Sequence, residues 1–561
     1  MIRSNISSVY GCDRLGREIP YSADRRDRLV GIFYFVWHDQ SGHDGPYDVS
    51  KIIAEDPTAA RDMDHPAWGP LNGAMHHWGE PLYGYYFSED EWIIRRHIEM
   101  LSYADIDFIV FDTTNRVIYF DKVTKIMSII SEYLSAGYNV PKVVFYTNTD
   151  SGGTVNELYD RIYSKGLYRD SWFIMDGKPL IIDKPDECRE EARDFFTHRI
   201  SQWPFDPVHK GGFPWMEFIR PQRVYRDGNG APEIMNVSVA QHPNCAHSDS
   251  AFFGEEGAWG RSFHDGAKDI RENSYEYGFN FAEQWEYALK KDPKMVFVTG
   301  WNEWTAGRWT FDRKQPTSFT LTNDEGSYTY SRDGIPETRG VMCDACSLEY
   351  SRDIEPMKGG YFDSYYMQLI EYVRRFKGGY GDCEDDGSGV EYSNFSLGNV
   401  GRSCRGYGHN FYSAEKSANN IVGMTVRSDK DNIIFTCSYE DDIVTEGKYS
   451  RLYIVPLSQD TYGSVMSPYR TATYIVRPDG VISRYLNKAE TGIGHAETSL
   501  SGRTISYTVP RDLIGMPSGS PSALDFKWAD GIAGDNTVED FYLNGCVAPY
   551  GRLCCRYITK E

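Results

Sequence analysis

The chain has 561 residues, a formal net charge of −22 at pH 7 and 15% aromatic residues. This acidic balance argues against a nucleic-acid-binding protein, because a phosphate-binding surface needs clustered lysine and arginine. The length exceeds what one hydrophobic core usually holds, so we expect two domains. The aromatic content, which includes 41 tyrosines, favours a protein that holds carbohydrate rings.

No apolar run reaches the roughly 20 residues of a membrane-spanning helix, and residues 1–8 lack the pattern of a secretory signal. The sequence fits a cytoplasmic protein or one whose signal lies outside this numbering. Of these two possibilities we expect the second, a secreted or periplasmic protein whose signal lies outside this numbering. Cys343 and Cys346 form an isolated pair, which is a weak zinc signal. We therefore expect no metal and no cofactor.

Between residues 29 and 378, short apolar runs alternate with longer helical patterns, which predicts a parallel sheet built from β/α repeats. Ser88, with Glu91 three positions later, predicts a capping box for a helix that ends near Ala104. The expected strands are 29–36, 108–111, 142–146, 180–182, 213–216, 234–239 and 295–298. A count near eight predicts a (β/α)₈ barrel, whose active site lies at the carboxyl ends of its strands.

Polar and aromatic residues follow several of these predicted strands, where a barrel would place its active site. Each has a structural alternative, such as capping a helix, bracing a loop or packing. They are Trp37, His38 and Asp39 after the first strand, Asp112 and Asn115 after the second, Glu217 after residues 213–216, and His242 after residues 234–239.

The last predicted strand runs directly into Trp301-Asn302-Glu303-Trp304. A carboxylate at a strand end beside tryptophans is how a glycosidase presents an acid or a base, and the indoles could form stacking walls for a sugar. The alternative is a buried glutamate that holds a loop by hydrogen bonds, since a buried carboxylate needs partners.

The composition changes after the barrel pattern. Residues 379–389 are rich in glycine and aspartate and predict a linker, and the short alternating runs beyond them predict an antiparallel β-sandwich. The runs are 421–426, 433–437, 452–456, 472–476, 505–509 and 524–528. The expected domains are an N-terminal extension (1–28), a catalytic barrel (29–378), the linker (379–389) and a sandwich (390–561).

The run from Trp301 to Trp304 resembles the Asn-Glu-Trp-His-Glu-Gly signature of glycoside hydrolase family 99 and of related family 71-like and WbsX-like barrels. Residues 351–378 are also similar to the closing segment of secreted members of this group. The family uses two glutamates three residues apart, one assisting attack by the sugar's 2-hydroxyl and the other acting as general acid. Glu303 matches the first and Ala306 stands at the second, so the family mechanism does not carry over whole.

Residues 525–530 and 540–552 are similar to family 9-like carbohydrate-binding modules. This resemblance implies a sugar-binding sandwich. The alternative is a sandwich that only packs against the barrel.

Glycoside hydrolysis needs one carboxyl group to protonate the leaving oxygen and a second group at the anomeric carbon. With Ala306 unable to act, other strand ends must supply the acid, and Asp112 is the best placed. Asp353 and Glu355 could also reach the site, but Arg352 beside them indicates a local ion-pair brace. The predicted catalytic residues are Glu303, Asp112 and Glu217, and the predicted substrate-binding residues are Trp37, His38, Asp39, Asn115, His242, Trp301, Asn302 and Trp304.

The sequence therefore predicts a glycosidase (an O-glycosyl hydrolase) that cleaves a complex polysaccharide or glycan. Ala306 keeps open a non-catalytic carbohydrate-binding protein on a degenerate barrel. A WbsX-like glycosyltransferase is a third hypothesis, but the sequence shows no phosphate-binding loop for a nucleotide sugar. The expected partner is a carbohydrate, and the sequence decides neither the sugar, the linkage nor the oligomeric state.

Overall fold

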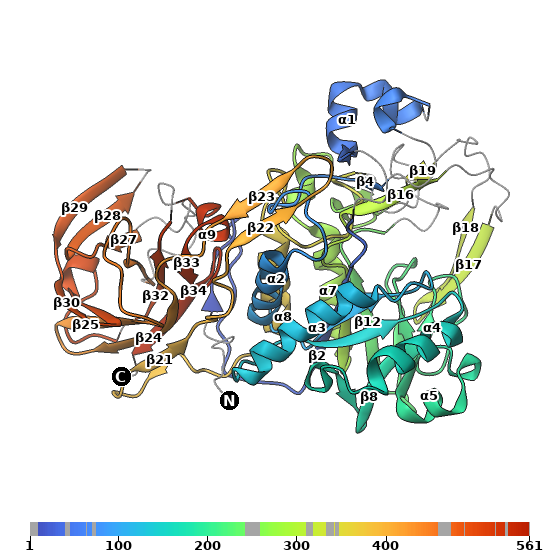
Figure 1. Ribbon diagram of the computed structural model, residues 1–561, viewed down its shortest axis with the longest axis horizontal. Helices are drawn as coiled ribbons and strands as arrows, with labels where there is room; N and C mark the ends of the chain where they lie inside the picture. The colour runs from blue at the N-terminus through green and yellow to red at the C-terminus, as the bar shows by residue number, and fades with distance from the viewer. Residues whose placement is uncertain are drawn as a thin grey trace.

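The computed structural model describes residues 9–39, 45–62, 64–69, 75–241, 259–309, 318–331, 341–342, 347–457, 473–486, 489–521, 523–532 and 537–559. Figure 1 shows a barrel-like body and, beside it, a region of β-sheets that contains the C-terminus.

A nearly closed, mainly parallel sheet forms the centre of the barrel-like body, which confirms the mixed α/β class. Neighbouring strands are parallel along the order β10-β9-β8-β6-β5-β2-β15-β12, and β11 lies antiparallel beside β12. Within the described residues no hydrogen-bonded pairing joins β10 to β12, so a closed eight-stranded barrel is not established. The strands are β2 (Leu29–Tyr34), β5 (Phe108–Asp112), β6 (Lys142–Tyr146), β8 (Lys178–Asp183), β9 (Thr197–Gln202), β10 (Gly212–Pro214), β11 (Val224–Arg226), β12 (Pro232–Ser238) and β15 (Met295–Thr299).

Helices cover the outside of this sheet because alternate strand residues are apolar on that face as well. In β2, Phe33 belongs to the apolar cluster inside the barrel, whereas Ile32 and Tyr34 belong to the cluster beneath the helices. Gly31 is required for close packing, since a Cβ there would lie 2.2 Å from the ring of Phe108. The helices are α2 (Glu91–Tyr103), α3 (Phe120–Ser135), α4 (Ser151–Leu158), α5 (Glu190–Phe195), α7 (Phe279–Lys291) and α8 (Ser364–Lys377).

The predicted capping box at Ser88 is wrong. Helix α2 begins after Asp90, whose side chain makes no capping hydrogen bond. The Ser88 hydroxyl instead accepts a hydrogen bond from the backbone N–H of His38, at 3.1 Å. The serine therefore ties the loop after β2 to the start of α2 rather than capping the helix.

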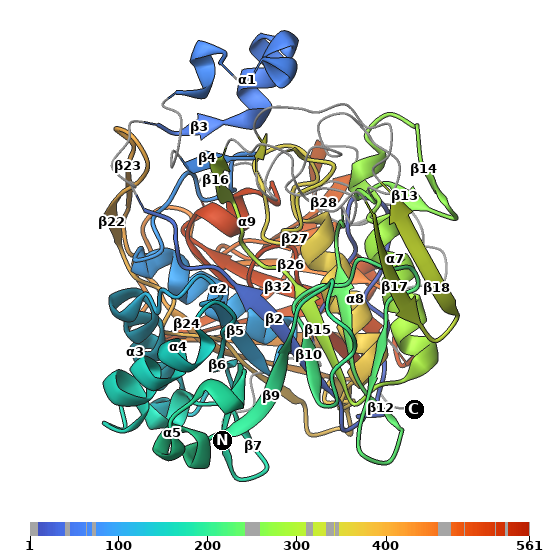
Figure 2. The same cartoon turned by 90° about the vertical axis from the view of Figure 1, so that its right-hand side faces the viewer.

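The hairpin β17 (Ser318–Asn323) and β18 (Gly326–Ser331) lies along the outer wall of the barrel-like body (Figure 2). Leu321 on β17 is 3% exposed and belongs to the apolar cluster inside the barrel, together with Phe213 of β10 and Ile234 of β12. Strands β10 and β12 flank the gap in the sheet where no hydrogen-bonded pairing was found among the described residues, which we call the seam. We therefore infer that the hairpin closes the seam with the apolar side chain of Leu321.

Leu321→Ala is expected to lower the free energy of unfolding by about 2–5 kcal/mol, because it leaves a cavity in a well-packed core. Thr320→Ala, one residue away on the exposed face of the same strand, should change it by less than about 0.5 kcal/mol. Urea unfolding of both variants measures the difference. Equal effects of the two substitutions would contradict the seam-closing role of Leu321.

The C-terminal region contains two mainly antiparallel sheets that share one apolar core. Five of the six predicted runs lie within strands, and of the run 472–476 residues 473–476 form β27 while residue 472 lies outside the described residues. The N-terminal strand β1 adds to the first sheet by pairing with β34. The first sheet has the order β1 (Val9–Tyr10), β34 (Cys554–Thr559), β32 (Ala523–Asp530), β26 (Arg451–Pro456), β27 (Thr473–Val476), β28 (Val481–Leu486), β29 (Ala489–His495). The second has the order β21 (Val390–Ser393), β24 (Ile421–Ser428), β25 (Asn432–Tyr439), β31 (Thr504–Pro510), β30 (Glu497–Ser501).

The two regions meet along helix α2. Glu99 of α2 is buried beside Gly398, and the hydroxyl of Tyr133 donates a hydrogen bond to it at 2.6 Å. Burial raises the pKa of Glu99 to about 7, while the Tyr133 hydrogen bond opposes that rise. The folded protein therefore holds a proton at this interface that the unfolded chain releases at lower pH.

Stability is expected to fall as the pH rises from about 4.5 to 7, because over that range only the unfolded chain gains the favourable charge of Glu99. The raised pKa corresponds to a loss on the order of 3 kcal/mol. Glu99→Gln removes this titration, so the unfolding free energy of that variant should fall less over the same range. Urea unfolding at several pH values tests this, with Glu132→Gln on the exposed side of α3 as control. An unchanged pH slope in Glu99→Gln would contradict it.

Candidate active site

Backbone and amide hydrogen bonds fix the loop that carries Glu303. The backbone N–H of Trp301 donates to the carbonyl of Phe33 at 2.9 Å. The side-chain oxygen of Asn302 accepts the N–H of Phe35 at 2.8 Å. Both contacts tie the loop after β15 to the end of β2, so the backbone that carries Glu303 is held in a fixed position. Glu303 is 7% exposed.

Arg352 is the charge partner of Glu303. Its Nη2 lies 2.8 Å from the Oε2 of Glu303, and the arginine side chain is 1% exposed. The neighbouring Asp353 accepts hydrogen bonds from the backbone N–H of Glu303 and from the Nε1 of Trp78, the latter at 2.8 Å. Burial raises the pKa of Asp353 to about 6, against the charges of nearby arginines. The sequence placed Arg352 in a brace for its neighbours, whereas in the structure it pairs with Glu303.

Asp112 ends strand β5 and is 2% exposed. Its Oδ1 accepts hydrogen bonds from the backbone N–H and the hydroxyl of Thr114, at 2.9 and 2.7 Å. Its Oδ2 accepts from the Nε1 of Trp215 at 3.3 Å. Burial raises the pKa of Asp112, and hydrogen bonds from Thr114 and Trp215 and the charge of Arg352 oppose the rise.

Trp215 and Arg352 connect the two carboxylates. The guanidinium carbon of Arg352 lies 5.2 Å from the ring centroid of Trp215, within the range of a cation–π contact. One end of this pair contacts Glu303 and the other contacts Asp112. Carboxylates from β5 and from the loop after β15 are therefore held by one shared aromatic and cationic unit.

Glu217 lies outside this unit. Its side chain is 0% exposed, and its two oxygens are taken by the Nε of Arg223 and the hydroxyl of Tyr225, both at 2.6 Å. Burial raises its pKa, and Arg223 opposes that rise. Both oxygens of Glu217 are used within the protein by residues that contact neither Glu303 nor Asp112, which favours a structural role over the predicted catalytic one.

The predicted stacking role of Trp301 and Trp304 also needs correction, because both residues are 0% exposed. The Trp304 ring stacks on Trp78 with centroids 4.4 Å apart, and its Nε1 donates to the buried carboxylate of Glu355. Asn302 is 1% exposed, and its amide exchanges hydrogen bonds with the backbone of Phe35, just after β2. These three side chains hold the loop rather than face a ligand.

Among the side chains that the structure describes, two half-buried tryptophans remain as candidates for a sugar wall. Trp37 was predicted, and its Nε1 donates to the carbonyl of Thr305 at 3.0 Å, which orients the ring. Trp203 was missed by the sequence reasoning. It stacks on Trp215 with centroids 4.7 Å apart and an interplanar angle of 29°.

The predicted polar residues after β2 have defined partners. His38 is 1% exposed, its Nδ1 lies 3.1 Å from the Ser88 hydroxyl, and burial lowers its pKa to about 3, so the ring is neutral. Asp39 is half-buried and pairs with Lys122 at 2.7 Å. A neutral buried imidazole does not supply a proton, whereas Asp39 presents a carboxylate that is paired with Lys122.

Asn115 is exposed and donates a hydrogen bond to the hydroxyl of Tyr119 at 2.7 Å, so it lies on the surface beside the end of β5. His242 lies outside the described residues. Within the described ranges, no group of three or more His, Cys, Asp or Glu side chains is placed to hold a metal ion. No helix among them is long and apolar enough to cross a membrane.

Comparison with known proteins gives neither a matching family model nor a matching curated protein. Two structures of the family 99 endo-α-mannosidase from Bacteroides thetaiotaomicron, one with bis-tris-propane, align with 63% of this chain and 98% of theirs. Their identities are 14% and 16%, and their TM-scores are 0.34 and 0.35. A family 9 carbohydrate-binding module from Caldicellulosiruptor kristjanssonii, in complex with glucose, aligns with 26% of this chain and 80% of its own, at 9% identity and a TM-score of 0.17.

These are the two families that the sequence motifs resemble. Overlaps with TM-scores below 0.5 bear on neither activity nor substrate, so the function of this chain is inferred from its own side chains.

Proposed function

We propose that the chain is a glycoside hydrolase that cleaves a glycosidic bond in a complex polysaccharide or glycan. The observation that supports this most directly is the convergence of Glu303 and Asp112 on Arg352 and Trp215. Burial biases Asp112 toward its neutral form, while Glu303 lies against a cation. Glycoside hydrolysis uses such a division between a carboxylic acid and a carboxylate.

In this proposal Asp112 is the general acid. Its proton passes to the glycosidic oxygen, which leaves as an alcohol with the electron pair of the broken bond. Glu303 acts at the anomeric carbon, either by activating the attacking oxygen or by stabilising the positive charge that develops there. Trp37 and Trp203 supply aromatic faces for the sugar rings, because an apolar ring face stacks well on an indole.

We further propose that residues 29–378 form a (β/α)₈ barrel opened between β10 and β12, followed by the linker 379–389 and a sandwich over 390–561. The strand order supports the barrel, and the shared core of the two antiparallel sheets supports the sandwich. A secreted or periplasmic location fits this proposal, since complex polysaccharides occur outside cells.

The second candidate is a carbohydrate-binding protein that does not cleave its ligand. Two observations favour it: Ala306 stands where the resembled family has its acid, and Glu303 is 7% exposed and paired with Arg352. A glutamate held in this way also fits a purely structural role.

Incubation of the purified chain with separate neutral and acidic polysaccharides distinguishes the two candidates. New reducing ends, measured over hours, support the hydrolase. Retardation in gels that contain a polysaccharide, with no reducing ends released from it, supports the binding protein. If no polysaccharide gives new reducing ends and none retards the protein, both candidates are excluded.

A further inference from the structure

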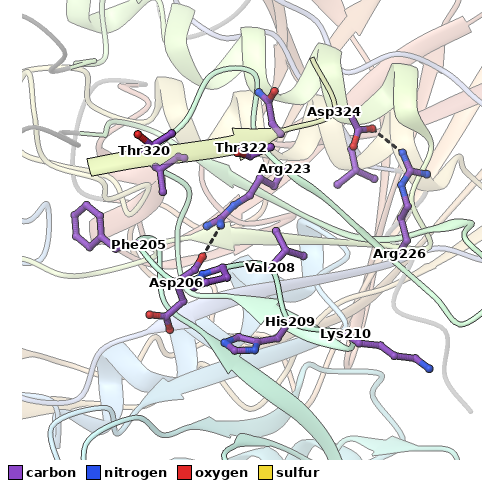
Figure 3. A pocket seen from close by; sticks show the side chains of 14 residues that line it. Phe205, Asp206, Val208, His209, Lys210, Arg223, Arg226, Thr320, Thr322 and Asp324 are labelled. Atoms are coloured by element: carbon purple, nitrogen blue, oxygen red, sulfur yellow. Dashed lines mark hydrogen bonds and ion pairs between the residues drawn. The ribbon is translucent and has the colours of Figure 1, made fainter. Parts of the chain in front are cut away.

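A groove with a volume of about 720 Å³ lies between the loop after β9, strand β11 and strand β17 of the seam-closing hairpin. Figure 3 shows Phe205 and Val208 of that loop on one side and Thr320 and Thr322 of β17 on the other. The volume falls in the range of small-molecule sites, roughly 300–1,000 Å³. Neither the Glu303 carboxylate nor Asp112 lines this groove.

The loop side of the groove presents two exposed apolar side chains, Phe205 and Val208, beside the polar Asp206, His209 and Lys210. Phe205 keeps 42% of its surface accessible and Val208 keeps 54%. Phe205 is supported from behind by Phe218, with ring centroids 5.2 Å apart. A supported aromatic ring that is left open to solvent offers a flat apolar face to a ligand.

The hairpin side carries hydroxyl groups. Thr320 and Thr322 are exposed, and each makes a cross-strand hydrogen bond of 2.8 Å, to Thr329 and Ser327 respectively. These pairings hold the hydroxyls in a row, where their remaining capacity can bind hydroxyl groups of a ligand. Aromatic surface opposite a row of hydroxyls suits a molecule with an apolar face and a polar edge.

The charges argue for a neutral ligand. Arg223 pairs with Glu217 at 2.6 Å and donates hydrogen bonds to the carbonyls of Asp206 and Pro204, both at 2.9 Å. Arg226 pairs with Asp324 at 2.6 Å. Arg223 and Arg226 are thus paired with Glu217 and Asp324, and the charge of Lys210 in the lining is balanced by that of Asp206, so the groove offers no net positive charge to a phosphate or a carboxylate.

The geometry points to a second sugar-binding site in this groove, which takes a neutral oligosaccharide segment. The inference deepens the proposed function, on which it rests for the choice of a carbohydrate. Trp203, on the same loop as Phe205, stacks on Trp215, which donates to Asp112. The loop after β9 thus joins the groove to the Glu303–Asp112 centre, so a polysaccharide bound in the groove stays tethered to the molecule that carries that centre.

The test uses the full chain with Glu303→Gln, so that bound polysaccharide is not consumed. Its retardation is measured in gels that contain α-mannan, xylan, laminarin or, as an acidic probe, polygalacturonate. At least one neutral polysaccharide should retard the protein, and Phe205→Ala should weaken that binding about tenfold. Thr322→Arg, which fills the groove from the opposite wall, should weaken it similarly. Phe411→Ala, at a residue 61% exposed on another hairpin, should leave binding unchanged.

Retardation by no neutral polysaccharide, or binding that is insensitive to both groove substitutions, would overturn the inference. Binding of polygalacturonate alone would overturn it as well. Release of reducing ends is measured separately, with the chain that keeps Glu303. The absence of binding in the groove is therefore distinguished from the absence of hydrolase activity. Phe205→Ala, made in the chain that keeps Glu303, should retain the kcat of that chain on a short chromogenic glycoside, since Phe205 does not contact the catalytic pair.

Discussion

Glu303→Gln is expected to lower kcat by about 10²–10⁴-fold on any substrate that the chain cleaves, the range that general acid–base catalysis contributes. Glutamine keeps the size of the side chain and an oxygen that accepts the hydrogen bond of Arg352. It carries no negative charge and accepts no proton, so the group at the anomeric carbon is lost while the loop stays in place. Initial rates, with thermal unfolding as a check on folding, measure both effects.

Glu217→Gln is the matched control for this substitution. Glu217 is also a buried carboxylate paired with an arginine, but it lies apart from the Trp215–Arg352 unit. Its replacement should leave kcat nearly unchanged and lower the free energy of unfolding by about 3–5 kcal/mol, because Arg223 stays buried without its counter-charge. If instead Glu217→Gln lost turnover and Glu303→Gln kept it, the catalytic assignment would move to Glu217.

Strands with continuous apolar runs were predictable from the sequence. Strands β2, β5 and β15 are buried on both faces, between the barrel interior and the helices, so almost every residue in them is apolar. Strand β9 (Thr197–Gln202) was missed because Ile200 is its only large apolar residue and four of its six residues are half-buried. Pairing with β8 and β10 in the folded sheet, and not the sequence pattern of the segment itself, makes it a strand.

The positions of Glu303 and Asp112 at strand ends followed from the same pattern, but their partners did not. Arg352 lies 49 residues after Glu303, and Trp215 lies 103 residues after Asp112, so only the fold brings them together. Nor does sequence spacing say which way a side chain points. Trp304 follows the glutamate directly, yet the loop turns its indole inward onto Trp78.

Asp112→Asn should lower kcat by about 10²–10⁴-fold on natural glycans, since the leaving oxygen then departs without a proton. The loss should be much smaller on an aryl glycoside with a highly acidic phenol, which leaves unassisted. If Asp112 is the acid, only its protonated form is active, so activity falls as the pH rises through its pKa. Because burial raises that pKa, the alkaline limb lies above the ordinary value of aspartate, and it should disappear in Asp112→Asn.

The matched control is Asp183→Asn. Asp183 is a fully buried aspartate that ends β8 as Asp112 ends β5, but its carboxylate pairs with His198 at 2.8 Å. Its replacement should cost stability and leave the pH profile of kcat unaltered. Should Asp112→Asn keep the full rate on a poor leaving group, or keep the alkaline limb, Asp112 is not the acid. Asp39, the charged carboxylate that pairs with Lys122 after β2, would then be the next residue to replace.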